Sequence, residues 1–289
     1  MDIRAILMGL AFAVMWSSAF TSARIIVMDA SPLLALSLRY LISGLIGVGI
    51  ALALGQSWRL TPAQWRATII FGVLQNAVYL GLNFIAMQTI EASLAAIIAS
   101  TMPLLVGFAA WAFLGEKLRP LGIAGLFAGV IGVAIIMGAR LGGQVDLYGL
   151  ILCAIGVVAL TAATLLVRGA TSGGNFLMVV GLQMLVGCVA LSIATLLFET
   201  PRIDPSLRLT LAFAYTCLVP GLAATVVWFW LVNRIGATRA APFHFLNPFF
   251  GVAIAALLLG ETLGPRDILG VAIIAGGILA VQISRQRKA

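Results

Sequence analysis

The fold is decided by EASLAAIIASTMPLLVGFAAWAFLGEKLRP, residues 91–120, and by its echo GATRAAPFHFLNPFFGVAIAALLLGETLGP, residues 236–265. Both stretches are apolar runs with a proline in the middle, Pro103 or Pro248, and both close with Gly-Glu-x-Leu-x-Pro. The second stretch starts 145 residues after the first, which is about half of the 289-residue chain. The sequence therefore predicts an internal duplication that covers the whole chain.

Apolar residues dominate the rest of the chain as well. They make up 62% of it, and charged residues make up only 9%, whereas a soluble domain carries about 25% charged residues. A transmembrane helix needs roughly 20 mainly apolar residues, and lipid offers the backbone no hydrogen-bond partner, so these runs should be helices. We expect ten spans, at residues 4–27, 32–54, 66–89, 92–114, 120–138, 147–167, 176–198, 209–232, 238–260 and 266–283.

The duplicated unit contains five of these spans, and five is an odd number. We place the first five-helix repeat at residues 1–144 and the second at residues 145–289. Because five crossings bring the chain out on the opposite side, the second repeat must enter the membrane from the other side. The expected fold is an all-α integral membrane protein with ten transmembrane helices, arranged as two inverted five-helix repeats around a central cavity.

The net charge of +8 is better explained by topology than by nucleic-acid binding. With the amino terminus in the cytoplasm, eleven of the 17 Lys and Arg residues fall inside and six fall outside, as the positive-inside rule requires. Ten spans bring the carboxyl terminus back to the same side. The sequence predicts a multi-pass protein of the cell inner membrane with both termini cytoplasmic.

The duplicated block resembles the EamA-type unit of the drug/metabolite transporter superfamily. The resemblance rests on Ala92 through Pro103 to Gly115-Glu116-Lys117-Leu118, and on Ala237 through Pro248 to Gly260-Glu261-Thr262-Leu263. It extends over the whole chain as two EamA units and implies transport of a small solute. Within that superfamily, the length and the aromatic and polar residues are most similar to bacterial exporters of aromatic amino acids.

Polar and aromatic residues deep in the spans are candidates for substrate binding, because such groups are costly in lipid and tend to face the bundle interior. Two of them, Asn83 and Asn247, are amides, and an amide at depth needs several hydrogen-bond partners. One is the single histidine, which is either a core residue that donates to a carbonyl or a ligand or proton site. The candidates are Trp16, Ser17, Tyr79, Asn83, Trp228, His244 and Asn247.

Two further pairs of residues recur in the repeats. Pro103 and Pro248 each free a backbone carbonyl one turn earlier and can bend the helix, so each marks either a gating hinge or a static kink. Glu116 and Glu261 end spans at the membrane surface, where a structural role at a helix end fits better than substrate binding.

The positions of the charges narrow the substrate class. All nine acidic residues lie at span ends or in loops, which argues against proton-driven antiport of cationic drugs and favours a neutral or zwitterionic, amino-acid-like solute. Arg39, about two turns into the second span, either snorkels outward or attracts a carboxylate. A drug, purine or other metabolite carrier of the same superfamily is the alternative.

Other classes of protein fit less well. A membrane-embedded enzyme would need a metal motif, a Ser-His pair or a pair of acids at depth, and the chain has one His and no deep acid. The three cysteines are isolated in apolar spans, so we expect free thiols rather than disulfides or a metal site. The sequence predicts no cofactor, and it leaves the oligomeric state and the driving force open.

Overall fold

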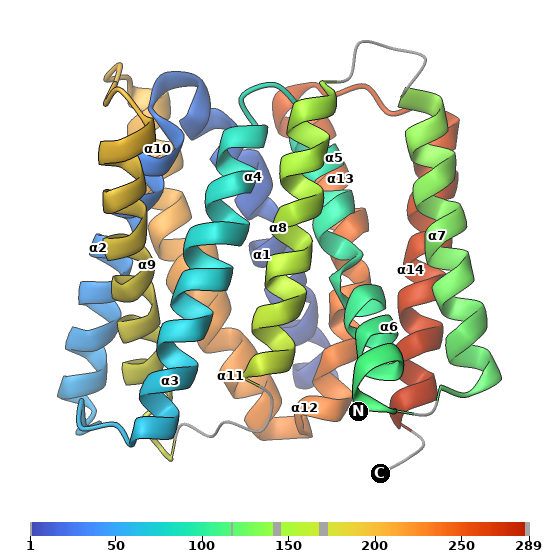
Figure 1. The fold of residues 1–289 in the computed structure, drawn as a ribbon, viewed down its shortest axis with the longest axis horizontal. Coiled ribbons are helices and arrows are strands. Elements are labelled where there is room, and N and C mark those ends of the chain that lie inside the picture. Colours follow the sequence, from blue (N-terminus) through green and yellow to red (C-terminus); the bar gives the residue numbers. More distant parts are fainter. Residues whose placement is uncertain (1, 117, 141–145, 168–172, 287–289) are drawn as a thin grey trace. The chain divides into compact units, whose positions relative to one another are not determined.

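The computed structural model describes residues 2–116, 118–140, 146–167 and 173–286 (Figure 1). Within these ranges nine segments are long and apolar enough to cross a membrane, and a shorter apolar helix covers residues Phe243–Leu259. All ten segments begin and end within a few residues of the predicted spans, so the all-α, ten-span fold is confirmed. The predicted repeat boundary at residues 144 and 145 lies outside the described residues.

Six of the ten spans are single helices: α1 (Ile3–Asp29), α2 (Pro32–Ala53), α7 (Pro120–Arg140), α8 (Leu147–Leu166), α9 (Phe176–Phe198) and α14 (Pro265–Gln286). The other four are interrupted: α3 (Pro62–Phe71), η1 (Gly72–Tyr79) and α4 (Leu80–Ala86); α5 (Ala92–Ser100) and α6 (Met102–Leu114); α10 (Leu207–Leu218), η2 (Val219–Ala223) and α11 (Ala224–Ile235); α12 (Ala237–Ala240), η3 (Ala241–Leu246) and α13 (Asn247–Leu259).

Helix starts and stops follow the local sequence. Pro32 and Pro62 each occupy the first helical position, where the missing N–H costs nothing and the fixed φ suits a helix. Gly115 and Gly260 end α6 and α13 with φ values of 67° and 69°, a left-handed conformation that favours glycine. The two Gly-Glu blocks of the sequence are therefore matching helix stops.

The interruptions recur at equivalent places in the two repeats. The π-helix η1 covers Gly72–Tyr79, and a shift of 145 residues carries this range onto 217–224, which contains the π-helix η2. In the same way, the break at Thr101 between α5 and α6 corresponds to the junction of η3 with α13 at Leu246. The duplication is thus visible in irregular backbone as well as in sequence.

The chain folds into two compact units that differ from the sequence repeats. Unit 1 comprises Met1–Thr21, Thr89–Leu150 and Ala223–Ala289, and unit 2 comprises Ser22–Gln88 and Ile151–Leu222. Each unit therefore contains helices from both repeats. In unit 1 the fifth helices of the two repeats, α7 and α14, lie side by side (Figure 1), and in unit 2 the second helices, α2 and α9, pack together.

Small residues allow both of these helix pairs to approach closely. In unit 1 a Cβ atom added to Gly125 would lie 2.7 Å from the carbonyl oxygen of Gly277. In unit 2 a Cβ atom added to Gly181 would lie 2.8 Å from the backbone nitrogen of Val48. Van der Waals packing of backbones across small residues is a main source of association between helices in lipid.

Side chains at helix ends cap the starts of neighbouring helices. In unit 1 the Glu261 carboxylate accepts hydrogen bonds from the backbone N–H groups of Ala92 at 2.8 Å and Ser93 at 2.9 Å. In unit 2 the Glu199 carboxylate does the same for Leu33 and Leu34. These N–H groups have no partner within their own helix, so the structure supports the expected helix-end role of Glu261.

Candidate functional site

Unit 1 contains a cluster of aromatic rings contributed by α1, α11 and η3. The ring of Phe12 lies at its centre, with ring centroids 4.6 Å from Trp228, 5.1 Å from His244 and 5.7 Å from Trp16. Trp228 and His244 also contact each other edge to face, at 4.8 Å. Such tilted and edge-to-face geometries are the favourable ones for aromatic rings.

Polar groups of Ser17 and Asn247 border this cluster. The Asn247 amide nitrogen lies 3.2 Å from Nδ1 of His244, and the Ser17 hydroxyl donates to the backbone carbonyl of Asn247 at 3.2 Å. The amide oxygen of Asn247 is buried and has no hydrogen-bond partner among the described residues. A buried acceptor without a donor is costly, so this oxygen is suited to receive a donor from a bound molecule.

The local sequence explains why His244 and Asn247 face the same way. Residues Ala241–Leu246 form a 3₁₀-helix, in which there are three residues per turn and side chains three apart lie above one another. Phe243 anchors this turn in a small core with Ala5 and Leu231. Its ring fills the space beside Gly9, where an added Cβ atom would lie only 2.2 Å from a ring carbon.

Five of the seven predicted site residues therefore come together in unit 1: Trp16, Ser17, Trp228, His244 and Asn247. The sequence analysis missed Phe12, the ring that joins them. Its position one helical turn before Trp16 was the available signal, because residues four apart lie on one helix face. Whether these residues bind substrate stays a prediction.

The other two predicted site residues, Tyr79 and Asn83, lie in unit 2. Both are buried, and the Asn83 amide is used inside the unit: its nitrogen donates to the Tyr79 carbonyl at 2.8 Å, and its oxygen is 3.4 Å from the Cys153 thiol. Gly156 packs against the same amide. These contacts join α4 to α8, and a substrate role for Tyr79 and Asn83 remains a prediction.

The two mid-span prolines lie at helix breaks rather than within continuous helices. Pro103 is the second residue of α6, directly after the interruption at Thr101, and Pro248 is the second residue of α13, directly after η3. Proline is tolerated in the first turn of a helix because its N–H is not needed there. The interruptions are thus part of the fold, and gating at Pro103 and Pro248 stays a prediction.

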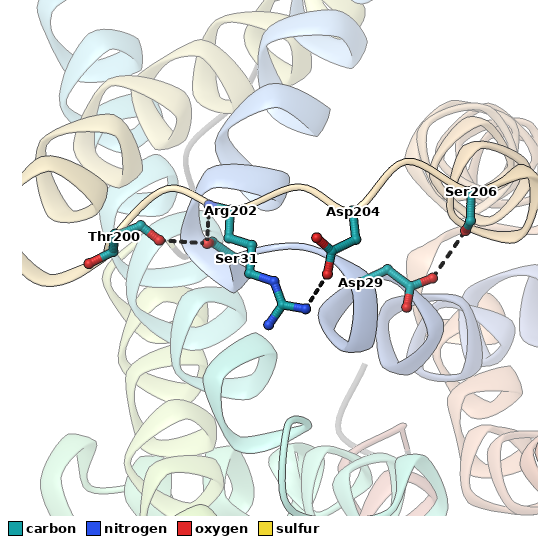
Figure 2. Close-up of polar contacts among 6 residues, drawn as sticks. All are labelled: Asp29, Ser31, Thr200, Arg202, Asp204 and Ser206. Atoms are coloured by element: carbon teal, nitrogen blue, oxygen red, sulfur yellow. Dashed lines mark hydrogen bonds and ion pairs between the residues drawn. The ribbon is translucent and has the colours of Figure 1, made fainter.

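A surface pocket of about 320 Å³ lies in unit 2 where α1 ends, α2 begins and α9 ends. Two charged residues of its lining, Asp29 and Arg202, have side-chain partners in the connection after α9 (Figure 2). Arg202 pairs with Asp204, Asp29 accepts from the Ser206 hydroxyl at 3.1 Å, and the Ser31 hydroxyl donates to the Thr200 carbonyl at 3.1 Å. These contacts tie the connection after α9 to the corner between α1 and α2.

The metal-binding residue types are scattered. In the described part of the chain no group of three or more His, Cys, Asp or Glu residues could hold a metal ion. Cys153, Cys188 and Cys217 are free thiols in the structure. The aromatic and amide cluster of unit 1 is the strongest candidate for binding a solute.

Within the described residues, nine segments long and apolar enough to cross a membrane, a tenth, shorter apolar helix and helix breaks at equivalent positions are the features expected of a multi-pass membrane transporter with an internal repeat. The chain belongs to the EamA-like transporter family, which it matches twice, at residues 3–138 and 147–283. The resemblance expected from the sequence is therefore confirmed, and the family makes this protein a transporter rather than an enzyme.

Named relatives show the same relationship. The chain is 26% identical to the uncharacterized transporter YvbV of Bacillus subtilis over 286 residues, which cover 97% of this chain and 92% of that protein. It is 30% identical to the aromatic amino acid exporter YddG of Ancylobacter novellus over 112 residues, 39% of each chain. A protein of known crystal structure aligns with this chain over the full length of both, with 22% identity and a TM-score of 0.70, which shows that the two share a fold.

Proposed function

We propose that this protein is a secondary transporter that exports small amphipathic amino acids, preferably aromatic ones, across the inner membrane by alternating access. The observation that carries the proposal is the pairing, in unit 1, of an aromatic ring cluster with the unsatisfied amide oxygen of Asn247. Phe12 and Trp228 offer apolar ring surface, His244 adds an imidazole ring beside them, and Asn247 offers an acceptor at the edge of the cluster.

An aromatic amino acid has complementary groups. Its ring can stack against the rings of the cluster, which is worth about 1 kcal/mol per aromatic pair beyond the burial of surface. Its ammonium group can donate to the Asn247 oxygen, and a hydrogen bond to a charged group contributes roughly 1.5 to 3 kcal/mol. An ammonium near Trp228 would also gain from the negative face of the indole ring.

The distribution of acidic residues supports a zwitterionic rather than a cationic solute. All nine are in the described ranges, at helix ends or in connections: Asp2, Asp29, Glu91, Glu116, Asp146, Glu199, Asp204, Glu261 and Asp267. A cationic drug in a low-dielectric site would need a buried carboxylate to compensate its charge. The name of one relative, an aromatic amino acid exporter, points in the same direction.

Reconstitution of the purified protein tests the proposal. Proteoliposomes loaded with labelled phenylalanine, tryptophan, threonine or methionine should release at least one aromatic amino acid faster than protein-free vesicles with the same load do. The Asn247→Met variant, which replaces the amide with an apolar side chain and so removes the acceptor, should release it at the rate of protein-free vesicles or close to it. If none of the four amino acids leaves faster than from protein-free vesicles, the proposed substrate class is wrong.

We propose further that both termini lie in the cytoplasm, on the basis of the excess of Lys and Arg predicted on that side. A reporter enzyme that is active only outside the cytoplasm, fused after the last residue, should be inactive. The same reporter inserted between α1 and α2 should be active. Activity in the reverse pattern would contradict the proposed topology.

A further inference from the structure

Arg39 lies inside unit 2, on α2, and only 7% of it is exposed. A side chain that snorkels along a helix keeps its charged head in water, so this burial contradicts the snorkelling alternative of the sequence analysis. The guanidinium carbon lies 5.3 Å from the centroid of the neighbouring Tyr40 ring. Tyr40 is itself buried, so Arg39 is held within the protein and away from lipid.

The Nε of Arg39 is buried and has no hydrogen-bond partner among the described residues. The acidic residues offer no counter-ion, since each is engaged elsewhere. Three of them contact hydroxyl groups: Asp29 contacts Ser206, Glu91 contacts Ser93, and Asp146 contacts Thr89. Asp2 and Asp204 pair with Arg234 and Arg202. Glu199, Glu261 and Asp267 accept from backbone N–H groups at helix starts. Arg39 is therefore a buried cation for which the described part of the chain provides no ion-pair partner.

The backbone of the π-helix η2 approaches this guanidinium group. A Cβ atom added to Gly221 would lie 3.8 Å from a terminal nitrogen of Arg39 and 3.3 Å from the Ser43 hydroxyl oxygen. Ser43 is fully buried and donates to the Cys217 carbonyl at 3.3 Å. Gly221 thus allows the backbone of η2 to pack closely against Ser43 and Arg39, in a π-helical turn of the kind that is frequent at functional sites.

An arginine cannot give up its proton in a protein, and burying an unpaired charge is costly unless an ion of opposite sign compensates it. A carboxylate fits the planar fork of the guanidinium group, with two parallel hydrogen bonds. We infer that Arg39, with Ser43 and the backbone of η2 at Gly221, forms within unit 2 an anion-binding site for a carboxylate such as the one that an amino acid carries. This inference rests on the proposed function, because amino acids carry that carboxylate.

Arg24, in the same unit, shows what a structural arginine looks like in this protein. Its guanidinium group donates to the backbone carbonyl of Met87 at the end of α4, where a positive charge stabilises the last turn of a helix. Arg24 is therefore a matched control: it is an arginine of unit 2 with a partner in the chain, whereas the Nε of Arg39 has none in the ranges that the structure describes.

Ligand-induced thermal stabilisation tests the anion site without any transport assay. In detergent, 3-phenylpropionate, a carboxylate without an amine, should raise the unfolding midpoint of the wild type and of Arg24→Gln, and should not raise that of Arg39→Gln. Without ligand, Arg39→Gln should unfold no earlier than the wild type, because it removes an uncompensated charge. An equal shift in Arg39→Gln and the wild type, or no shift in the wild type, would overturn the site.

Competition for transport separates this inference from the proposed function. Phenylalanine should compete for wild-type efflux at least tenfold better than phenylalaninamide, which lacks the carboxylate, and Arg39→Gln should lose this preference while Arg39→Lys keeps part of it. If Arg39→Gln transports and keeps the full preference, the anion site is wrong and the proposed function stands. If the wild type moves no amino acid, the proposed function is wrong, and the 3-phenylpropionate shift alone decides the anion site.

Discussion

The fourth and ninth spans are two copies of one sequence, and both lie in unit 1. Both are interrupted at the equivalent place, Thr101 or Leu246, and both stop at a left-handed glycine. In both cases a residue just before the span makes a polar contact with an aspartate at the start of another span; we call these two contacts the entry contacts. Thr89 donates to Asp146 at 2.6 Å before the fourth span, and Arg234 pairs with Asp2 before the ninth.

The two spans differ in the turns that precede the interruption. In the fourth span, Ala92–Ser100 is a regular α-helix, whereas in the ninth the α-helix ends at Ala240 and Ala241–Leu246 is a 3₁₀-helix. Pro242 stands where the first copy has Ile97, and a proline lacks the N–H that a continuing α-helix would use. The ninth span therefore shares the interruption and the final glycine of the fourth span, but its turns before the interruption, Ala241–Leu246, adopt a different type of helix.

The polar side chains that distinguish the ninth span lie in this 3₁₀-helix and directly after it. His244 and Asn247 occupy the positions of Ala99 and Met102 in the first copy. His244 is one ring of the aromatic cluster, and Asn247 borders it. The comparison teaches that shared features of the repeats concern the fold, whereas the positions where the repeats differ are the candidates for substrate recognition. The predictions below test this division.

The largest expected effect comes from making the ninth span resemble the fourth at its polar positions. Asn247→Met should reduce the initial rate of amino-acid efflux by roughly 10- to 100-fold, because a hydrogen bond to a charged group contributes about 1.5 to 3 kcal/mol. The unfolding midpoint should stay close to that of the wild type. Met102→Leu, at the equivalent position of the fourth span, is the control and should transport normally, and an equal loss in both variants would break the comparison.

The next effect concerns a shared structural feature. Glu261→Ala removes the carboxylate that caps the N-terminus of α5 through Ala92 and Ser93, which should destabilise the protein by about 2 kcal/mol. Thermal unfolding in detergent measures it, and Glu261→Gln, which keeps an acceptor oxygen, should lose less. Unchanged stability of Glu261→Ala would show that the Gly-Glu block has a role other than capping.

A smaller effect is expected from the backbone difference itself. Pro242→Ile restores the residue of the first copy and the missing N–H, so Ala241–Leu246 should become more α-helical and His244 should turn away from Asn247. Transport should fall a few-fold with no loss of stability, and hydrogen exchange of this segment should slow. Wild-type transport together with slowed exchange would show that the 3₁₀ geometry does not matter for recognition.

Much of this comparison was available from the sequence. The 145-residue offset, the ten spans and the two prolines were visible because hydrophobic run length and proline spacing are local signals. Five of the seven predicted site residues also proved to be neighbours in one cluster. Glu261 was expected to have a helix-end role, but its capping partner, 169 positions away, was not foreseeable from one sequence.

Other features depend on packing that no local pattern encodes. The π-helices η1 and η2 involve shifts of backbone hydrogen bonds within segments that read as ordinary apolar helices. The burial of Arg39 depends on the neighbours that surround its side chain, and its position in α2 alone allowed two alternatives. Tyr79 and Asn83 were grouped with the other candidates by polarity, whereas the Asn83 amide bonds within its own unit.

The smallest expected effect concerns the two entry contacts, Arg234 with Asp2 and Thr89 with Asp146, and is a change in how the unfolding midpoint depends on pH. The hydrogen bond from Arg234 lowers the pKa of Asp2 from 3.8 to about 2. Because the folded-state pKa is depressed, this pair stabilises the protein fully above pH 3.8, and its contribution is lost as the pH falls towards 2. Asp2→Asn should remove this part of the acid dependence of the unfolding midpoint. The pKa of Asp146 is also lowered, chiefly by the Thr89 hydroxyl, so Asp146→Asn is the matched variant.

Photo-crosslinking tests most directly the claim that His244 and Asn247 of the ninth span contact the substrate. A phenylalanine analogue with a diazirine on its ring, activated by light in proteoliposomes, should label peptides that contain Phe12 and Trp16 or His244 and Asn247. Excess phenylalanine should suppress the label. Labelling confined to residues 92–114, or labelling that phenylalanine does not suppress, would contradict the assignment of recognition to the ninth span.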